Sequence, residues 1–267
     1  MKTRTCTITH RAAAAMQMAA LLAALGFIGS TPTTAGEWKW SLTPYVWATD
    51  VGVDVSLDDR QVVSKTLRFS DLLDGIDAAA QGHVEALHGA HGLMFDVFEV
   101  ELSEDDSRFD LPMPPGASAR LDSKVGMTIV EAAGIFDPHG DQKGFSFLYG
   151  TRLLWQRNTL DARFDMGPVT TTREYESDDR YVDALAGVRF SQSLSRRWGY
   201  LVRADASTGG TKLTWSGGAA VGYTFGPNGR YTATAGYRYM SVNYDDTEPL
   251  DTEMTLSGIF TGLRFSF

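Results

Sequence analysis

Cysteine is nearly absent from this sequence, and the only one, Cys6, lies close to the start of the chain. We expect residues 1–35 to be a cleaved export signal, because basic residues precede an apolar stretch at 12–29 and a small residue, Ala35, follows it. Cleavage there would remove the cysteine, so residues 36–267 could form neither disulfides nor thiolate metal sites. A retained membrane anchor is the alternative for this segment.

An excess of basic residues is also missing. The chain has 24 lysines and arginines against 33 acidic residues, which gives a formal net charge of -9. Loss of the signal, with its three cations, would make the charge more negative. An acidic exported protein binds polyanions poorly, so we expect no nucleic-acid partner.

Long hydrophobic runs are absent after residue 35, which excludes a transmembrane helix there. Apolar residues instead alternate with polar or small ones, as in 213–225 and 231–239, with a tight turn at 226–229 between them. This period of two is typical of β-strands. The pattern predicts ten strands, at 37–57, 78–88, 91–103, 119–136, 145–155, 182–190, 198–205, 213–225, 231–239 and 252–267.

The predicted fold is all-β, a transmembrane antiparallel up-and-down β-barrel in residues 36–267. A soluble β-sandwich also alternates, but here aromatic residues gather at strand ends and short connections alternate with longer ones, as in bacterial membrane barrels. An even strand number places both ends of the barrel domain in the periplasm. Residues 58–77 could form an outward hairpin and a short helix from Ser70; if 61–69 spans instead, the count becomes twelve.

The last predicted strand, GIFTGLRFSF, resembles the signal that the outer-membrane barrel assembly machinery recognises, through Gly262, Phe265 and Phe267. More broadly, the segments WKWSLTPYVWATDVGVDV, YVDALAGVRF and AGYRYMSVNYDD look like a poorly characterised family of Gram-negative outer-membrane β-barrel proteins. The resemblance implies the fold, an outer-membrane location, and contact with periplasmic chaperones, membrane lipid and lipopolysaccharide. It implies no activity.

The polar face of the strands predicts a charged lumen. A ten-stranded barrel is narrow inside, so these charges should pair and fill it. The alternative is a narrow passive pore for small anions, selected by arginines. Glu131 falls on the parity assigned to lipid, so we expect a β-bulge near Ile129 to turn it inward. The lumen set is His83, Glu85, Asp96, Lys124, Arg152, Asp183, Arg189, Arg203, Asp205 and Arg238, to which the same parity adds Lys39, Arg120, Asp122, Lys212 and Arg264.

Enzymatic activity is not expected, and no catalytic residue or metal ligand is assigned. His83 and Glu85 lie two apart on one strand and could act as a general base with an orienting carboxylate. A barrel hydrolase or acyltransferase using them is therefore the third hypothesis. No serine is obviously placed as a nucleophile, however, and His88 and His91 read as a periplasmic turn.

Acidic residues concentrate in or beside the predicted outer loops, at 58–77, 101–110, 174–179 and 245–253. An acidic surface facing lipopolysaccharide needs divalent cations between the two anionic layers. We therefore expect no resident cofactor, only loosely bound divalent cations. The primary functional hypothesis is an integral outer-membrane barrel with a structural or envelope-interaction role through these acidic extracellular loops.

Overall fold

The computed structural model describes residues 38–57, 60–72, 76–110, 118–140, 142–166, 169–244 and 250–267. Residues 38–267 form one compact unit. The expected signal at 1–35 and its cleavage site lie outside the described residues.

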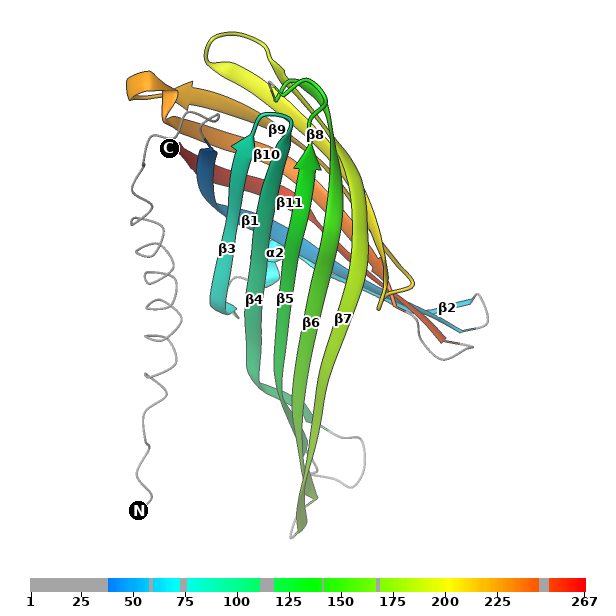
Figure 1. The fold of residues 1–267 in the computed structure, drawn as a ribbon. Coiled ribbons are helices and arrows are strands. Elements are labelled where there is room, and N and C mark those ends of the chain that lie inside the picture. Colours follow the sequence, from blue (N-terminus) through cyan, green and yellow to red (C-terminus); the bar gives the residue numbers. More distant parts are fainter. Residues whose placement is uncertain are drawn as a thin grey trace. The chain divides into compact units, whose positions relative to one another are not determined.

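This unit is built almost entirely from antiparallel strands (Figure 1). Among the described residues, no helix has the length and apolar character needed to cross a membrane. The elements are β1 (Lys39–Leu57), β2 (Arg60–Leu67), α2 (Phe69–Leu72), β3 (Ile76–His88), β4 (His91–Asp110), β5 (Ser118–Phe136), β6 (Gly144–Met166), β7 (Val169–Ser193), β8 (Trp198–Gly209), β9 (Leu213–Phe225), η2 (Pro227–Gly229), β10 (Tyr231–Asn243) and β11 (Leu250–Ser266).

Ten of the described strands close into a ring in which β11 pairs with β1. Strand β1 has two partners on its other edge: its first residues pair with β3, and residues 51–57 pair with β2. Strand β2 is therefore an outward hairpin attached to β1 and does not span the membrane. The ten-strand prediction is confirmed and the twelve-strand alternative is wrong. The short helix α2 starts at Phe69, one residue before the expected Ser70.

The two faces of the ring differ as the alternation requires. Large apolar side chains such as Val46, Leu93 and Ile259 are exposed on the outer face, where lipid would cover them. Aromatic pairs gather at the short-turn end, which the barrel rule places in the periplasm. These pairs are Trp38 with His88, His91 with Phe136, Phe145 with Phe190, Trp198 with Tyr223, and Tyr231 with Phe265.

Strands β4 to β7 run well beyond the level of this apolar belt (Figure 1). The segment between the predicted strands 145–155 and 182–190, expected to be a loop, is mostly paired strand: β6 and β7 stay in register from Gly144↔Ser191 to Met166↔Val169. Residues 171–180 of β7 are almost all exposed. Outside the membrane both faces of a strand meet water, so the residues need not alternate in polarity and leave no period-two signal.

The connection between β8 and β9 is a short one on the outer side. Asp183 holds its tip by accepting hydrogen bonds from the backbone N–H groups of Gly210 (2.9 Å) and Thr211 (2.8 Å). Above this tip the longer neighbours meet, since the rings of Tyr181 and Tyr244 lie 5.1 Å apart. The outer wall is thereby continued by side-chain packing where the ladder between β7 and β8 has ended.

Strand β5 differs from expectation. The ladders to β4 and β6 show no register shift near Ile129, so the predicted bulge is absent. Met127, Ile129 and Glu131 all point inward and are buried. The lipid-facing side of β5 was assigned to the wrong parity, because the interior at this level is itself apolar and the two faces look alike in sequence.

Candidate functional site

The centre of the lumen holds a cluster of buried charges that we call the central cluster: Glu131, Arg152, Arg203, Asp205 and Arg238. Glu131 accepts from three arginines: Arg152 Nη2 at 2.7 Å, Arg238 Nη2 at 3.1 Å and Arg203 Nη2 at 2.7 Å. Glu131 and Arg152 are both 0% exposed. Three positive partners offset the cost of burying this carboxylate.

A second carboxylate completes the central cluster. Asp205 receives Arg152 Nη2 at 2.5 Å and the hydroxyl of Ser216 at 2.9 Å, and it lies 2.7 Å from Arg203 Nε. Arg152 also donates from Nη1 to Ser207 at 3.0 Å. The guanidinium of Arg152 therefore bridges β5, β6 and β8 across the lumen.

Toward the short-turn end lies a second group, here called the histidine cluster: His83, Glu85, Asp96, Arg189 and Arg264. His83 Nδ1 is 3.1 Å from Asp96 Oδ2, and His83 Nε2 is 3.1 Å from Glu85 Oε1. Arg189 Nη1 lies 2.5 Å from Glu85 Oε1, and Arg264 Nη2 lies 4.0 Å from Glu85 Oε2. A contact of 3.6 Å between Arg238 and Asp96 joins this cluster to the central one.

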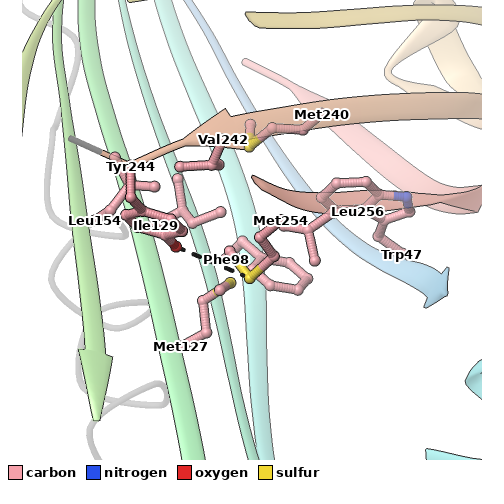
Figure 2. Close-up of a cluster of buried hydrophobic side chains, with 10 residues drawn as sticks. All are labelled: Trp47, Phe98, Met127, Ile129, Leu154, Met240, Val242, Tyr244, Met254 and Leu256. Atoms are coloured by element: carbon pink, nitrogen blue, oxygen red, sulfur yellow. Dashed lines mark hydrogen bonds between the residues drawn. The ribbon is translucent and has the colours of Figure 1, made fainter. Parts of the chain in front are cut away.

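Toward the outer end, the lumen is filled by apolar side chains (Figure 2). Trp47 packs edge-to-face on Phe98, with ring centroids 5.2 Å apart, and the Arg238 guanidinium lies 4.9 Å from the Trp47 ring. This apolar cluster thus rests directly on the central cluster. Its members are Trp47, Phe98, Met127, Ile129, Leu154, Met240, Val242, Tyr244, Met254 and Leu256.

Two hollows flank these layers. The inner cavity, at the short-turn end, has a volume of about 370 Å³ and is lined by the histidine cluster and by Arg203 and Arg238. An outer hollow of about 430 Å³ lies beside Asp54 and Tyr244. They share no lining residue, because the central and apolar clusters stand between them.

Nine of the ten residues expected in the lumen lie on its inner face: all but Lys124. Lys124 is exposed, and on strand β5 it points to the face opposite that of the buried Met127. Its assignment to the lumen was wrong because the two faces of β5 were exchanged in the prediction. Asp183 is buried but holds the β8–β9 tip rather than an arginine. Of the wider set, Lys39 and Lys212 are exposed, and the side chains of Arg120 and Asp122 lie outside the described residues.

Aromatic members of the site were missed by sequence reasoning. The Tyr45 hydroxyl donates to Asp96 at 2.9 Å, and Trp47 supports Arg238. Both share parity with the small polar residues Ser41 and Thr43, which could have marked them as inward-facing. Aromatic side chains in a membrane barrel were instead expected on its outer face.

The last strand is held in the ring at both edges. Gly262 pairs with Tyr45 on β1, the Phe265 ring packs at right angles on Tyr231, and the Phe267 N–H donates to the Trp40 carbonyl at 2.9 Å. These contacts are structural, and a role of Gly262, Phe265 and Phe267 in assembly stays a prediction. Within the described part of the chain, no group of three or more histidine, cysteine or acidic side chains is arranged so that it could hold a metal ion.

No family model and no curated protein matches the chain. Several solved structures are similar to the chain at low identity. The translocator domain of the autotransporter NalP from Neisseria meningitidis is 12% identical, with a TM-score of 0.40 over 97% of this chain and 98% of that one. The outer membrane protease OmpT from Escherichia coli is 9% identical, with a TM-score of 0.40 over 89% and 99%. Ail of Yersinia pestis is 11% identical, with a TM-score of 0.32 over 88% and 100%.

The architecture itself identifies the environment. A closed ring with an apolar outer face, aromatic residues at its short-turn end and charges inside satisfies every backbone group of a spanning strand without water. Barrels of this kind reside in the outer membrane. The chain is an integral outer-membrane β-barrel.

Proposed function

We propose that this barrel is closed to solutes and serves the envelope through the strands that it presents outside. The observation that carries the proposal is the stack of two layers across the lumen, the central cluster and the apolar cluster. An ion would have to break arginine–carboxylate pairs and then cross an apolar zone, both of which are costly.

Planar bilayer recording tests the closed lumen. Purified barrel should give no stable conductance. Reproducible conductance steps that lose anion selectivity in Arg203→Glu would instead support the narrow passive anion pore, since that arginine lines the inner cavity and belongs to the central cluster.

The acids on the outer extension support an interaction role. Glu174, Glu176 and Asp179 are exposed on β7 beyond the apolar belt, where lipopolysaccharide phosphates would lie. Two anionic layers attract each other only through bound cations, so we propose loosely held divalent cations between them. Not every acid there is available: Asp178 lies 3.3 Å from Arg180 Nε and 4.0 Å from Arg157 Nη2.

A hydrolytic role for His83 is disfavoured by its partners. Each ring nitrogen faces a carboxylate, so a ring that donates from both has no lone pair left to accept a proton from a nucleophile. The nearest cross-strand hydroxyl, on Thr43, makes no hydrogen bond to it among the described residues. Cleavage of peptide or lipid that is lost in His83→Ala would contradict the non-enzymatic proposal.

A further inference from the structure

We propose that the inner cavity binds a small organic anion that carries one acidic group on an apolar body, taken up from the periplasmic side. Nothing in the closed-lumen role requires such a site. The inference rests on unsatisfied donors, on the charges of the lining, on its apolar walls, and on where the cavity opens.

Four residues that line the cavity carry a buried donor without a hydrogen bond, and in one of them, Arg203, this Nε atom lies 2.7 Å from Asp205. Among the described residues, Arg189 Nε, Arg264 Nε and Thr43 Oγ1 make no hydrogen bond. Arg189 is only 6% exposed, so water does not freely replace the missing acceptor. A buried donor left unpaired is costly and rare in folded proteins, which points to an acceptor that the protein itself does not supply.

The two arginines are held side by side by one carboxylate. Arg189 reaches Glu85 Oε1 through Nη1, and Arg264 approaches Oε2 of the same residue through Nη2. They come from β7 and β11, and Glu85 comes from β3. Arg189 therefore contacts Glu85 through Nη1, which leaves Nε on the edge that binds a planar acid side-on, whereas Arg264 contributes its positive charge beside it.

The charge of the lining favours an anion. Five lysine or arginine side chains line the cavity against two carboxylates, and both carboxylates are engaged by His83. Glu131 and Asp205 lie behind this wall and pair with Arg152, Arg203 and Arg238, so Arg189 and Arg264 share the single carboxylate of Glu85.

The rest of the cavity wall is apolar, which favours a ligand whose body is also apolar. A volume of about 370 Å³ falls in the range of small-molecule sites, about 300–1,000 Å³. A bare inorganic ion would leave most of this space and its apolar surface unused. The apolar lining comprises Tyr45, Trp47, Met94, Leu148, Leu201 and Phe260.

The cavity extends from the short turns to the central cluster. Its rim includes Gln142, Lys143 and Ser193 from the short turns, whereas its floor is the central cluster. An anion entering from the periplasm would be retained rather than passed across the membrane. The site is therefore a receptor pocket in a closed barrel.

The test uses the full barrel in lipid nanodiscs with 4-(trifluoromethyl)benzoate as probe and its neutral amide as the uncharged match. Fluorine NMR relaxation reports binding, with empty nanodiscs as the background. We expect the benzoate to bind at least tenfold more tightly than the amide. Arg264→Gln and Arg189→Gln should each weaken benzoate binding tenfold or more, while Arg196→Gln, on the exposed β7–β8 turn, should not change it.

The variant Ala220→Phe tests the site without depending on whether the arginine variants fold. Ala220 lines the cavity from β9, and a phenyl ring there occupies cavity volume without adding or removing a charge. This variant should keep the heat-modifiable gel mobility of a folded barrel and should no longer bind the benzoate. Benzoate binding that survives in Ala220→Phe, equal affinity for the benzoate and its amide, or displacement by equimolar inorganic phosphate would each overturn the proposal.

Discussion

Arg152 and Glu131 are direct cross-strand partners on β6 and β5, fully buried, with Arg152 Nη2 2.7 Å from Glu131 Oε1. The pair joins two neighbouring strands, and through Arg203 and Arg238 it ties them to the opposite wall. The lumen is therefore cross-braced by charge at its centre.

Removing one member of this pair should destabilise the barrel strongly. Arg152→Met leaves Glu131 short of a donor in the interior, and the expected loss is about 3–5 kcal/mol in the free energy of unfolding. Urea titration in detergent micelles, read by tryptophan fluorescence, measures it. The double variant Arg152→Met with Glu131→Leu should recover much of the loss, and Arg180→Ala on the exposed outer strand should change nothing.

Glycine at the ring closure should not tolerate a methyl group. A Cβ on Gly258 would lie 1.8 Å from the Ala48 carbonyl oxygen across the β1–β11 seam, so the strands must part. Gly258→Ala should cost about 1–3 kcal/mol, the usual penalty of overpacking. Gly82→Ala is the matched control, because nothing lies within 4 Å of its added Cβ. Equal melting of the two variants on heat-modifiability gels would contradict this account of the seam.

The aromatic residues of β11 should affect assembly more than stability. If Phe265 and Phe267 are part of a recognition signal, Phe265→Ala with Phe267→Ala should lower the folded barrel recovered in outer-membrane fractions severalfold. Phe145→Ala removes an exposed aromatic side chain from the same end of the barrel and serves as control. Similar recovery of both variants would leave interfacial anchoring as the role of all three rings.

The outer acids should respond to divalent cations. Neutralising Glu174, Glu176 and Asp179 to their amides should weaken magnesium-dependent binding of the barrel to lipopolysaccharide vesicles, since fewer carboxylates remain to share the cation. Arg196→Gln with Arg197→Gln changes charge at the opposite end and should have no effect. Co-sedimentation with and without a chelator measures the difference; binding that ignores the chelator would argue against bridging cations.

The ten-strand ring could be predicted from the sequence because lipid requires apolar side chains on one face of each spanning strand. Lipid does not impose this alternation in two places, and there the predictions from the sequence were wrong. Inside, Met127 and Ile129 point into the lumen because the outer half of the lumen is apolar, which inverts the expected parity of β5 and misplaces Lys124. Outside the membrane, residues 171–180 form a strand whose faces are both polar, which period-two patterning cannot reveal.

The candidate site was foreseen as a set of inward charges, but not as pairs. Parity says that Glu85 and Arg189 share the interior; it does not say that strands β3 and β7, far apart in the ring order, reach each other across it. The shear and the strand tilt of the barrel determine such contacts, and the alternation of residues predicts neither of them. The unpaired donors of the inner cavity are likewise visible only once every acceptor has been placed.

The pairing of β1 with β11 also bears on how the barrel comes together. Trp47 belongs to the first strand of the ring, while Met254 and Leu256 belong to the last, and all three meet in the apolar cluster. Contacts between such distant parts of a chain form slowly, so this seam should close late in folding. The apolar cluster is then completed only in the step that closes the ring.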